Sequence, residues 1–519
     1  MGHLPLGNLS VRRLVPLWFG CFLAFALLYV ATCQRGPGWH DSGLLQYRIW
    51  TQDYEGRLGV ALAHPLHIAL GQIAKLVPGA FCWATGALSG IAMAAALANL
   101  ACLVAELTGR RWVGAMTSGL LAVCHAVWWI STVTEVYTLS VAGLTVELWL
   151  LRRLLQSPRP GCAVALGLIS GLGLANHNFA LLPLPVYATA VVVLAMRQRI
   201  PKWTPAATLA AWLVGASPVL IMTVRLAMQE GSVVSAAKSA LFGVAWAHEV
   251  LNISGSSSVL KANLVLMSLN FFSAIAPLAV VGWIAMRRRM GAATAAAFAA
   301  ITVIHVVFVV RYSVPDQFTF ALPALTMVAV AAGLGMDDLC RRGDRWREGV
   351  IAACCATFLL QPAAYAAAPR VFRAAKIAIP AKRDMAFLDE HRWFLTPWKH
   401  DEDSAHRFAV AALAQAGPNG VVLRDTTAVF PMLVLRDVSG MYPGVAIQSF
   451  GRLEGLPSCQ SDPALFRRAV ADRPVFLVNT EQGTSANALR GQVTLQRGTG
   501  EVLHRVVWSE RIASRGRIR

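Results

Sequence analysis

Apolar runs long enough to cross a membrane recur along the first 370 residues, and this feature constrains the fold more than any other. A bilayer core about 30 Å thick needs roughly 20 apolar residues in a helix. The candidate spans are 14–32, 86–107, 112–130, 136–151, 161–175, 179–196, 205–224, 263–286, 292–310, 318–335 and 348–368. The sequence therefore predicts a mainly α-helical, polytopic membrane protein with about eleven transmembrane helices.

The composition agrees with a membrane protein. Hydrophobic residues make up 56% of the chain and charged residues only 14%, whereas soluble domains carry about 25% charged residues. The net charge of +19 would suggest nucleic-acid binding in a soluble protein. Here the basic residues gather in short loops between apolar runs, so the charge indicates orientation in the bilayer and no nucleic-acid partner is expected.

The distribution of basic residues predicts the topology. If the N-terminus is cytoplasmic, the inner loops hold about twice as many Lys and Arg residues as the outer loops before residue 370. Both long loops, 33–85 and 225–262, then lie outside. An odd number of spans also places the C-terminal segment outside. We expect a transmembrane domain over 1–369 and a soluble domain over 370–519.

The C-terminal segment has the pattern of a small α/β domain. Residues 401–416 predict a helix that ends before a Gly-Pro pair. Residues 420–424 and 474–478 have the apolar character of buried strands. Asp462 and Pro463 provide an N-cap and a first helical residue. Alternating helices and strands of this kind favour an α/β arrangement.

The first outer loop, 33–85, combines charged, aromatic and apolar residues. Asp41 follows the first span by about nine residues, which places it near the outer surface. Residues 44–60 mix aromatic and charged side chains, as helices at a membrane interface do. His64-Pro65 interrupts them, and 66–77 carries a single apolar stripe at helical spacing. We expect two interfacial helices that cover the outer face.

Three further polar points interrupt apolar segments on the same predicted side as Asp41. They are Glu135 with Tyr137, Asn176 with His177, and Arg311 with Asp316. A carboxylate at such a depth is unfavourable without a partner. Independent polar residues would be distributed over both sides, so their convergence indicates one site at the outer interface.

Each of these residues also has an ordinary explanation. Asp41 could be a plain loop carboxylate, and Glu135 could be the structural ion-pair partner of Arg311. His177 could bond backbone at a helix end, and Arg225 and Arg311 could reach toward lipid headgroups. The loop histidines with Asp41 offer possible metal ligands, but loop histidines more often are not ligands, and no cofactor is expected.

The polar points together resemble a known family. Their order and spacing are similar to those of the bacterial protein O-mannosyltransferase-like membrane family, formerly a domain of unknown function, in the GT-C glycosyltransferase superfamily. The matching segments are Trp39-His-Asp41-Ser42-Gly43, His64-Pro65, Glu135-Val136-Tyr137, Asn176-His177 and 312–316 with Phe320 and Pro323.

The resemblance implies a function. It implies transfer of mannose or another hexose from a polyprenyl-phosphate donor to a protein or glycan hydroxyl, with inversion, at the periplasmic face of a bacterial inner membrane. Asp41 would be the general base, and Glu135 and His177 would complete the catalytic set. The implied substrate-binding residues are His64, Tyr137, Asn176 and Asp316. Arg311 and Arg225 are the outer arginines that end spans, so they are the candidate substrate-binding cations for the donor phosphate.

Two departures from the family pattern keep other functions open. The acidic residue that follows Asp-Ser-Gly in the family is Leu44 here, and Leu66 and His67 replace a proline and a glycine. A non-catalytic protein that binds lipid-linked glycans is therefore one alternative. A transporter or flippase is another, but transporter sites lie near the midplane between inverted repeats, and no such repeat is visible.

Overall fold

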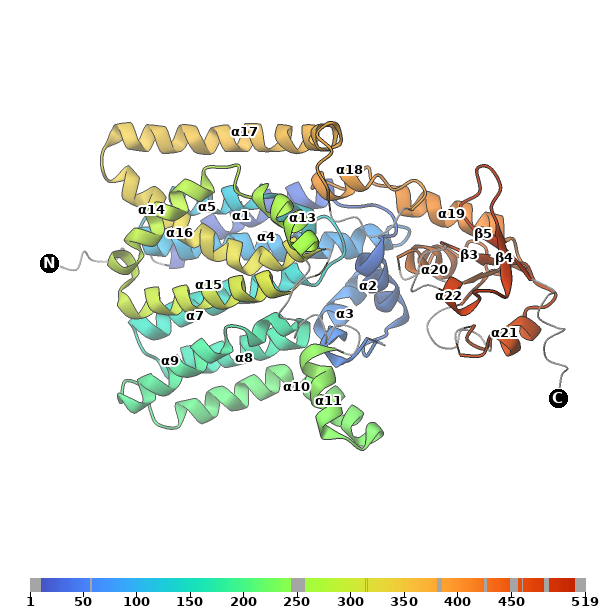
Figure 1. Ribbon diagram of the computed structural model, residues 1–519. Helices are drawn as coiled ribbons and strands as arrows, with labels where there is room; N and C mark the ends of the chain where they lie inside the picture. Colours follow the sequence, from blue (N-terminus) through green and yellow to red (C-terminus); the bar gives the residue numbers. More distant parts are fainter. Residues whose placement is uncertain are drawn as a thin grey trace.

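The computed structural model of the chain describes residues 11–56, 58–243, 257–312, 314, 316–379, 385–423, 427–448, 456–459, 461–479 and 485–508. Within it, helices that run side by side form a bundle, and a small sheet lies beyond one end of this bundle (Figure 1). The bundle helices are α1 (Val11–Thr32), α4 (Phe81–Thr108), α5 (Arg111–Ala122), α6 (His125–Ile130), α7 (Tyr137–Gln156), α8 (Pro160–Asn176), α9 (Leu184–Met196), α10 (Thr204–Glu230), α13 (Ser257–Ser268), α14 (Ile275–Met290), α15 (Ala292–Arg311), α16 (Leu322–Cys340) and α17 (Asp344–Ala374).

The predicted spans coincide with these helices, and the mainly α-helical membrane fold is confirmed. Among the described residues, seven helical segments are long and apolar enough to cross a membrane. Helix α8, with 17 residues, is shorter than these seven but also apolar. The count of eleven spans stays a prediction.

Two predicted spans are each broken into two helices. The span 112–130 divides into α5 and α6, and the span 263–286 divides into α13 and α14. The two breaks support each other, because the side-chain oxygen of Asn270 accepts a hydrogen bond from the backbone N–H of Ala126 at 2.8 Å. The Tyr365 hydroxyl donates to the carbonyls of Val123 (3.1 Å) and Leu269 (3.4 Å). Backbone groups freed in an apolar region need such partners.

Small residues set the close approach of neighbouring helices. A Cβ atom on Gly282 of α14 would lie 1.6 Å from the carbonyl oxygen of Ala331 of α16, and one on Gly335 would lie 1.9 Å from that of Leu278. Helices in membranes associate through backbone contact of this kind. The interior of the bundle is therefore fixed by glycine positions as well as by large apolar side chains.

The basic loops meet at the end of the bundle away from the sheet. Asp337 is 1% exposed and forms ion pairs with Arg110 at 3.3 Å, Arg289 at 2.9 Å and Arg341 at 2.8 Å. These arginines come from the α4–α5 loop, the end of α14 and the residue after α16. Three loops predicted to be inner therefore lie together, as the charge pattern requires.

The absolute orientation is a testable prediction. We expect reporter enzymes fused after Val60 or His400 to be active in the periplasm, and fusions after Arg199 or Gly343 to be active in the cytoplasm, because short basic loops stay inside. The measurement is the activity of alkaline phosphatase and of a fluorescent protein at each position. Cytoplasmic activity after His400 would contradict the odd number of spans.

The first outer loop forms helices at the other end of the bundle. They are α2 (His40–Thr51), the 3-10 turn η1 (Val60–Leu62), α3 (Pro65–Gly71) and η2 (Gln72–Leu76). The loop is helical as predicted, although α2 begins and ends earlier than predicted, and the position of these helices at the membrane interface stays a prediction. Helix α2 is covered by the C-terminal segment: the Tyr47 hydroxyl donates to Asp437 at 2.9 Å, and the Trp39 indole donates to Ser404 at 2.8 Å. Helix α11 (Val233–Phe242) lies beside η1.

The C-terminal segment has the predicted α/β character. Its five strands are β1 (Val421–Leu423), β2 (Ala446–Gln448), β3 (Val475–Leu477), β4 (Val493–Gln496) and β5 (His504–Trp508), in the order β2-β1-β3-β5-β4. The first three pair in parallel and the last two join antiparallel. The helices are α18 (Glu390–Leu395), α19 (Ser404–Ala416), α20 (Val429–Asp437), α21 (Pro463–Ala469) and α22 (Ser485–Ala488). The division at residue 370 stays a prediction.

Candidate functional site

The turn before α7 brings Glu135 to the end of the bundle that carries α2 and α3. The Ser89 hydroxyl of α4 donates to the Glu135 carbonyl at 3.1 Å and accepts from the Glu135 N–H at 2.9 Å. This pair of bonds satisfies the backbone of a buried turn, which has no helical partners there. Glu135 is 7% exposed and has further interactions besides its two backbone bonds with Ser89.

Asn176 joins three segments of the site. Its side-chain amide donates to the Val136 carbonyl at 3.0 Å and to the Ser140 hydroxyl at 2.8 Å. The backbone carbonyl of Asn176 accepts a hydrogen bond from Nδ1 of His64 at 2.7 Å. The C-terminal end of α8 is thereby tied to the start of α7 and to the start of α3. Asn176 is 1% exposed, so its first role is to position these segments.

Two buried imidazoles lie against each other at this junction. The rings of His64 and His177 are nearly parallel, at 6°, with centroids 5.3 Å apart. His177 accepts a hydrogen bond from the Phe179 N–H on its Nδ1 atom at 3.1 Å. Burial lowers the pKa of both imidazoles, that of His177 to about 3, so both rings are neutral.

The backbone at two histidines is in a left-handed conformation. His40 and His64 have φ angles of 50° and 52° at the starts of α2 and α3. Non-glycine residues adopt this region uncommonly, and strained backbone clusters at functional sites. Both positions are next to predicted site residues or are site residues themselves.

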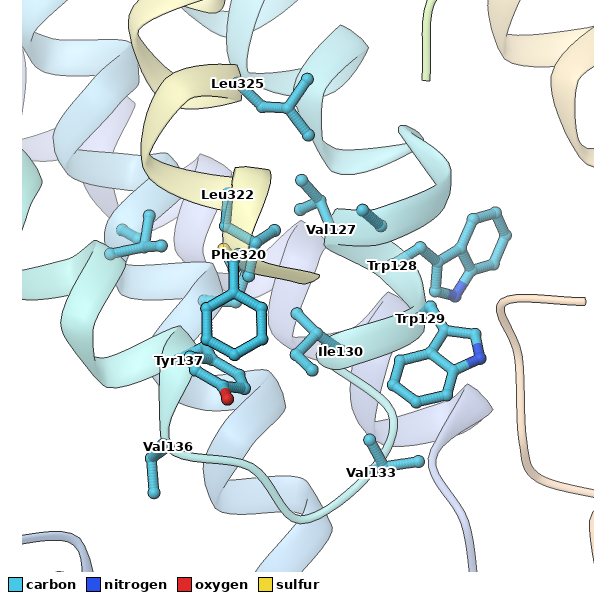
Figure 2. Close-up of a cluster of buried hydrophobic side chains, with 14 of the residues drawn as sticks. Val127, Trp128, Trp129, Ile130, Val133, Val136, Tyr137, Phe320, Leu322 and Leu325 are labelled. Atoms are coloured by element: carbon cyan, nitrogen blue, oxygen red, sulfur yellow. The ribbon is translucent and has the colours of Figure 1, made fainter. Parts of the chain in front are cut away.

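Tyr137 lies in an aromatic cluster at the same end of the bundle. Its ring packs on Phe320 (5.2 Å), Phe179 (5.6 Å) and the edge of His177 (5.2 Å). Figure 2 shows the Tyr137 ring beside Phe320, with the hydroxyl directed away from Leu322 and Leu325. The phenol interacts electrostatically with Glu135, Asp316 and Asp41. The three predicted carboxylates are therefore near enough to influence one tyrosine electrostatically.

Asp41 occupies the first turn of α2 and is exposed. A carboxylate at a helix N-terminus is stabilised in its charged form by the helix dipole. Asp41 makes interactions within the protein and is not an isolated loop charge. An exposed carboxylate near Tyr137 can accept a proton from a bound molecule when it is charged.

The predicted cations are placed differently from one another. Arg311 is the exposed last residue of α15, next to Tyr312, whose ring packs on Phe308 at 5.4 Å and Phe320 at 4.8 Å. No hydrogen bond or ion pair of Arg311 occurs within the described part of the chain. Two residues of the predicted 312–316 segment, at 313 and 315, lie outside the described residues.

Arg225 lies elsewhere, on α10. It is 67% exposed and forms an ion pair with Glu55 at 4.0 Å. Among the residues that the structure describes, no hydrogen bond, ion pair or ring contact joins Arg225 to Tyr137 or to the rings that pack on it. Its predicted role in substrate binding stays a prediction.

Arg48 is a buried cation of the first outer loop, and no role is assigned to it from the sequence. It is 4% exposed, and its guanidinium donates to four backbone carbonyls of the loop before His64. The acceptors are Asp53 (3.0 Å), Tyr54 (3.2 Å), Leu62 (2.9 Å) and Ala63 (2.6 Å). A motif search cannot find this role, because the acceptors are backbone atoms whose positions depend on the loop conformation.

This arrangement, a helical membrane bundle with a polar site at the end that carries a small α/β segment, is a GT-C-like architecture. Two solved structures share it. The ArnT structure from Cupriavidus metallidurans bound to undecaprenyl phosphate matches with a TM-score of 0.58 and 14% identity, over 96% of this chain and 98% of that chain. The apo ArnT structure from the same organism matches with a TM-score of 0.57 and 15% identity, over 95% and 98%.

These similarities show the fold, and the fold that the resemblance implied is confirmed. No protein-family model matches the chain, and no curated protein matches it in sequence. Membership of the O-mannosyltransferase-like family therefore stays a prediction, as do the roles of the individual site residues.

Proposed function

We propose that the protein is a membrane glycosyltransferase that moves a sugar from a polyprenyl-phosphate carrier to a hydroxyl acceptor on a protein or glycan. The observation that supports this proposal is the ArnT-like bundle, at one end of which Asp41, Glu135 and Asp316 all influence Tyr137 electrostatically. One ArnT structure holds undecaprenyl phosphate. The location that fits is a bacterial inner membrane with the site on the periplasmic side.

The proposed reaction is one in-line displacement. The acceptor oxygen forms a bond to the anomeric carbon, while the bond from that carbon to the phosphate oxygen breaks. The acceptor proton passes to the Asp41 carboxylate, and the electron pair of the broken bond leaves with the polyprenyl phosphate. A single displacement inverts the anomeric configuration. Glu135 and His177 would position the sugar, while Tyr137, Asn176 and Asp316 would shape its binding site.

Arg311 is the proposed contact for the leaving phosphate. The guanidinium is exposed at the outer end of α15 and one residue from the aromatic group that contacts Tyr137. Planar guanidinium groups bind phosphate through two parallel hydrogen bonds, which a lysine ammonium cannot reproduce. Arg225 is less suited, because it is paired with Glu55 on another helix.

Arg311→Lys is therefore expected to weaken donor binding by about 5- to 10-fold, with little change in folding. The measurement is the affinity for undecaprenyl phosphate in detergent or nanodiscs. Arg225→Lys provides a matched control and should bind as the wild type does. Unchanged affinity in Arg311→Lys would exclude this contact and move the role to Arg35, which is also exposed.

The experiment that tests the function is transfer of a labelled sugar in proteoliposomes. Undecaprenyl phosphates that carry different hexoses are supplied together with peptide or glycan acceptors. Labelled acceptor with the inverted anomeric configuration supports the proposal. Binding of the donor without any transfer would favour the non-catalytic alternative, and movement of the intact lipid between leaflets would favour a flippase.

A further inference from the structure

The two stacked histidines have defined and opposite protonation states. A backbone carbonyl can only accept a hydrogen bond, so Nδ1 of His64, 2.7 Å from the Asn176 carbonyl, carries the proton. A backbone N–H can only donate, so Nδ1 of His177, which accepts from Phe179, carries none. Because both rings are neutral, Nε2 of His64 is a hydrogen-bond acceptor and Nε2 of His177 is a donor.

The Nε2 atoms remain available to a bound molecule. Neither atom forms a hydrogen bond with the residues that the structure describes, and neither is a solvent-inaccessible atom without a partner. By contrast, Nε2 of the neighbouring His67 is fully enclosed and unpaired. The two neighbouring rings, with centroids 5.3 Å apart, thus offer one acceptor from His64 and one donor from His177.

We infer that His64 and His177 form a fixed acceptor–donor pair that binds a hydroxyl group of the transferred sugar and not the phosphate of its lipid carrier. A hydroxyl both donates and accepts, so it can satisfy both rings. Phosphate oxygens mainly accept, and one of them would face the lone pair of His64. The electrostatic partners of the adjacent Tyr137 include three carboxylates, which also disfavour an anion at this place. The inference rests on the proposed function and adds that the two histidines recognise a hydroxyl of the donor sugar.

Substitutions to asparagine and glutamine test the two nitrogens of each imidazole ring separately. The amide of asparagine occupies the place of Nδ1, and the amide of glutamine occupies the place of Nε2. His177→Asn therefore keeps an acceptor for the Phe179 N–H and removes the donor toward the ligand, whereas His177→Gln keeps that donor. His64→Asn keeps the donor to Asn176 and removes the acceptor. Asparagine also tolerates the left-handed backbone at position 64.

The test compares bare undecaprenyl phosphate with undecaprenyl phosphates that carry mannose, glucose or galactose. We expect the wild type to bind one of the sugar-bearing lipids more tightly than the bare lipid. His64→Asn and His177→Asn should lose roughly 10-fold or more of the affinity for that sugar-bearing lipid and keep the affinity for the bare lipid. His177→Gln should retain most of the preference.

Several outcomes would overturn the inference. They are an equal loss for bare and sugar-bearing lipids, no loss for either, and a wild type without any sugar preference. The ¹⁵N chemical shifts of the two histidines give a test without ligand, and reversed tautomers or doubly protonated rings would also overturn it. If the variants lose the sugar preference while no acceptor is ever glycosylated, the transferase proposal fails, but binding of a sugar hydroxyl by the two histidines is supported. If transfer occurs and the variants bind the sugar-bearing lipid as the wild type does, the transferase proposal is supported and this inference is wrong.

Discussion

Asp41→Asn is expected to lower the rate of sugar transfer by about 10²- to 10⁴-fold, the usual contribution of a positioned general base. The substitution preserves the shape of the side chain and removes its ability to take the acceptor proton. Donor binding should survive, because the proposed phosphate contact is Arg311. The measurements are transfer of labelled sugar in proteoliposomes and binding of undecaprenyl phosphate.

The fold should be little affected, because Asp41 is exposed and the loss of a carboxylate in the first turn of a helix costs only about 0.3–1 kcal/mol. Asp53→Asn is the matched control: Asp53 lies in the same outer loop, is 42% exposed and accepts from the Gly56 N–H. Transfer at the wild-type rate in Asp41→Asn would refute the base assignment. A comparable loss in Glu135→Gln alone would move the role to Glu135.

The membrane helices are accessible to sequence reasoning because their signal is local. About twenty apolar residues in a row predict a transmembrane helix regardless of the neighbouring sequence. The same reasoning misplaces breaks within spans, because the interruption between α5 and α6 depends on Asn270 and Tyr365, which are far away in the sequence. The helices and strands of the C-terminal segment were equally local in origin, and Gly417 and Asp462 mark helix ends as expected.

That the polar points lie at one end of the bundle also follows from the sequence, because successive spans run in opposite directions. The contacts between these residues do not follow from the sequence. Nothing in the chain indicates that Asn176 would bond Ser140 and hold His64, or that α2 would be covered by residues almost 400 positions later, as Tyr47 and Asp437 show. Hydropathy predicts which side of the membrane a residue is on, but side-chain geometry depends on the packed fold.

Arg48→Met should destabilise the protein by about 3 kcal/mol or more, the second large effect that we expect. Methionine fills a similar volume without the N–H groups that bind the carbonyls of Asp53, Tyr54, Leu62 and Ala63. Each buried carbonyl without a partner costs about 1–3 kcal/mol, and the loop can regain part of this by opening to water. The apparent melting temperature in detergent and protease cleavage between residues 52 and 63 measure the change.

The same variant should also weaken sugar binding, because Arg48 holds the carbonyl of Ala63, directly before the strained His64. Arg225→Met is the matched control. Arg225 contacts the same loop through Glu55, but both side chains are more than 60% exposed and 4.0 Å apart. Exposed pairs of this kind contribute about 0–1 kcal/mol. If Arg48→Met has the same apparent melting temperature as Arg225→Met, other contacts hold the loop. The Arg48 guanidinium then becomes a candidate for binding the donor phosphate.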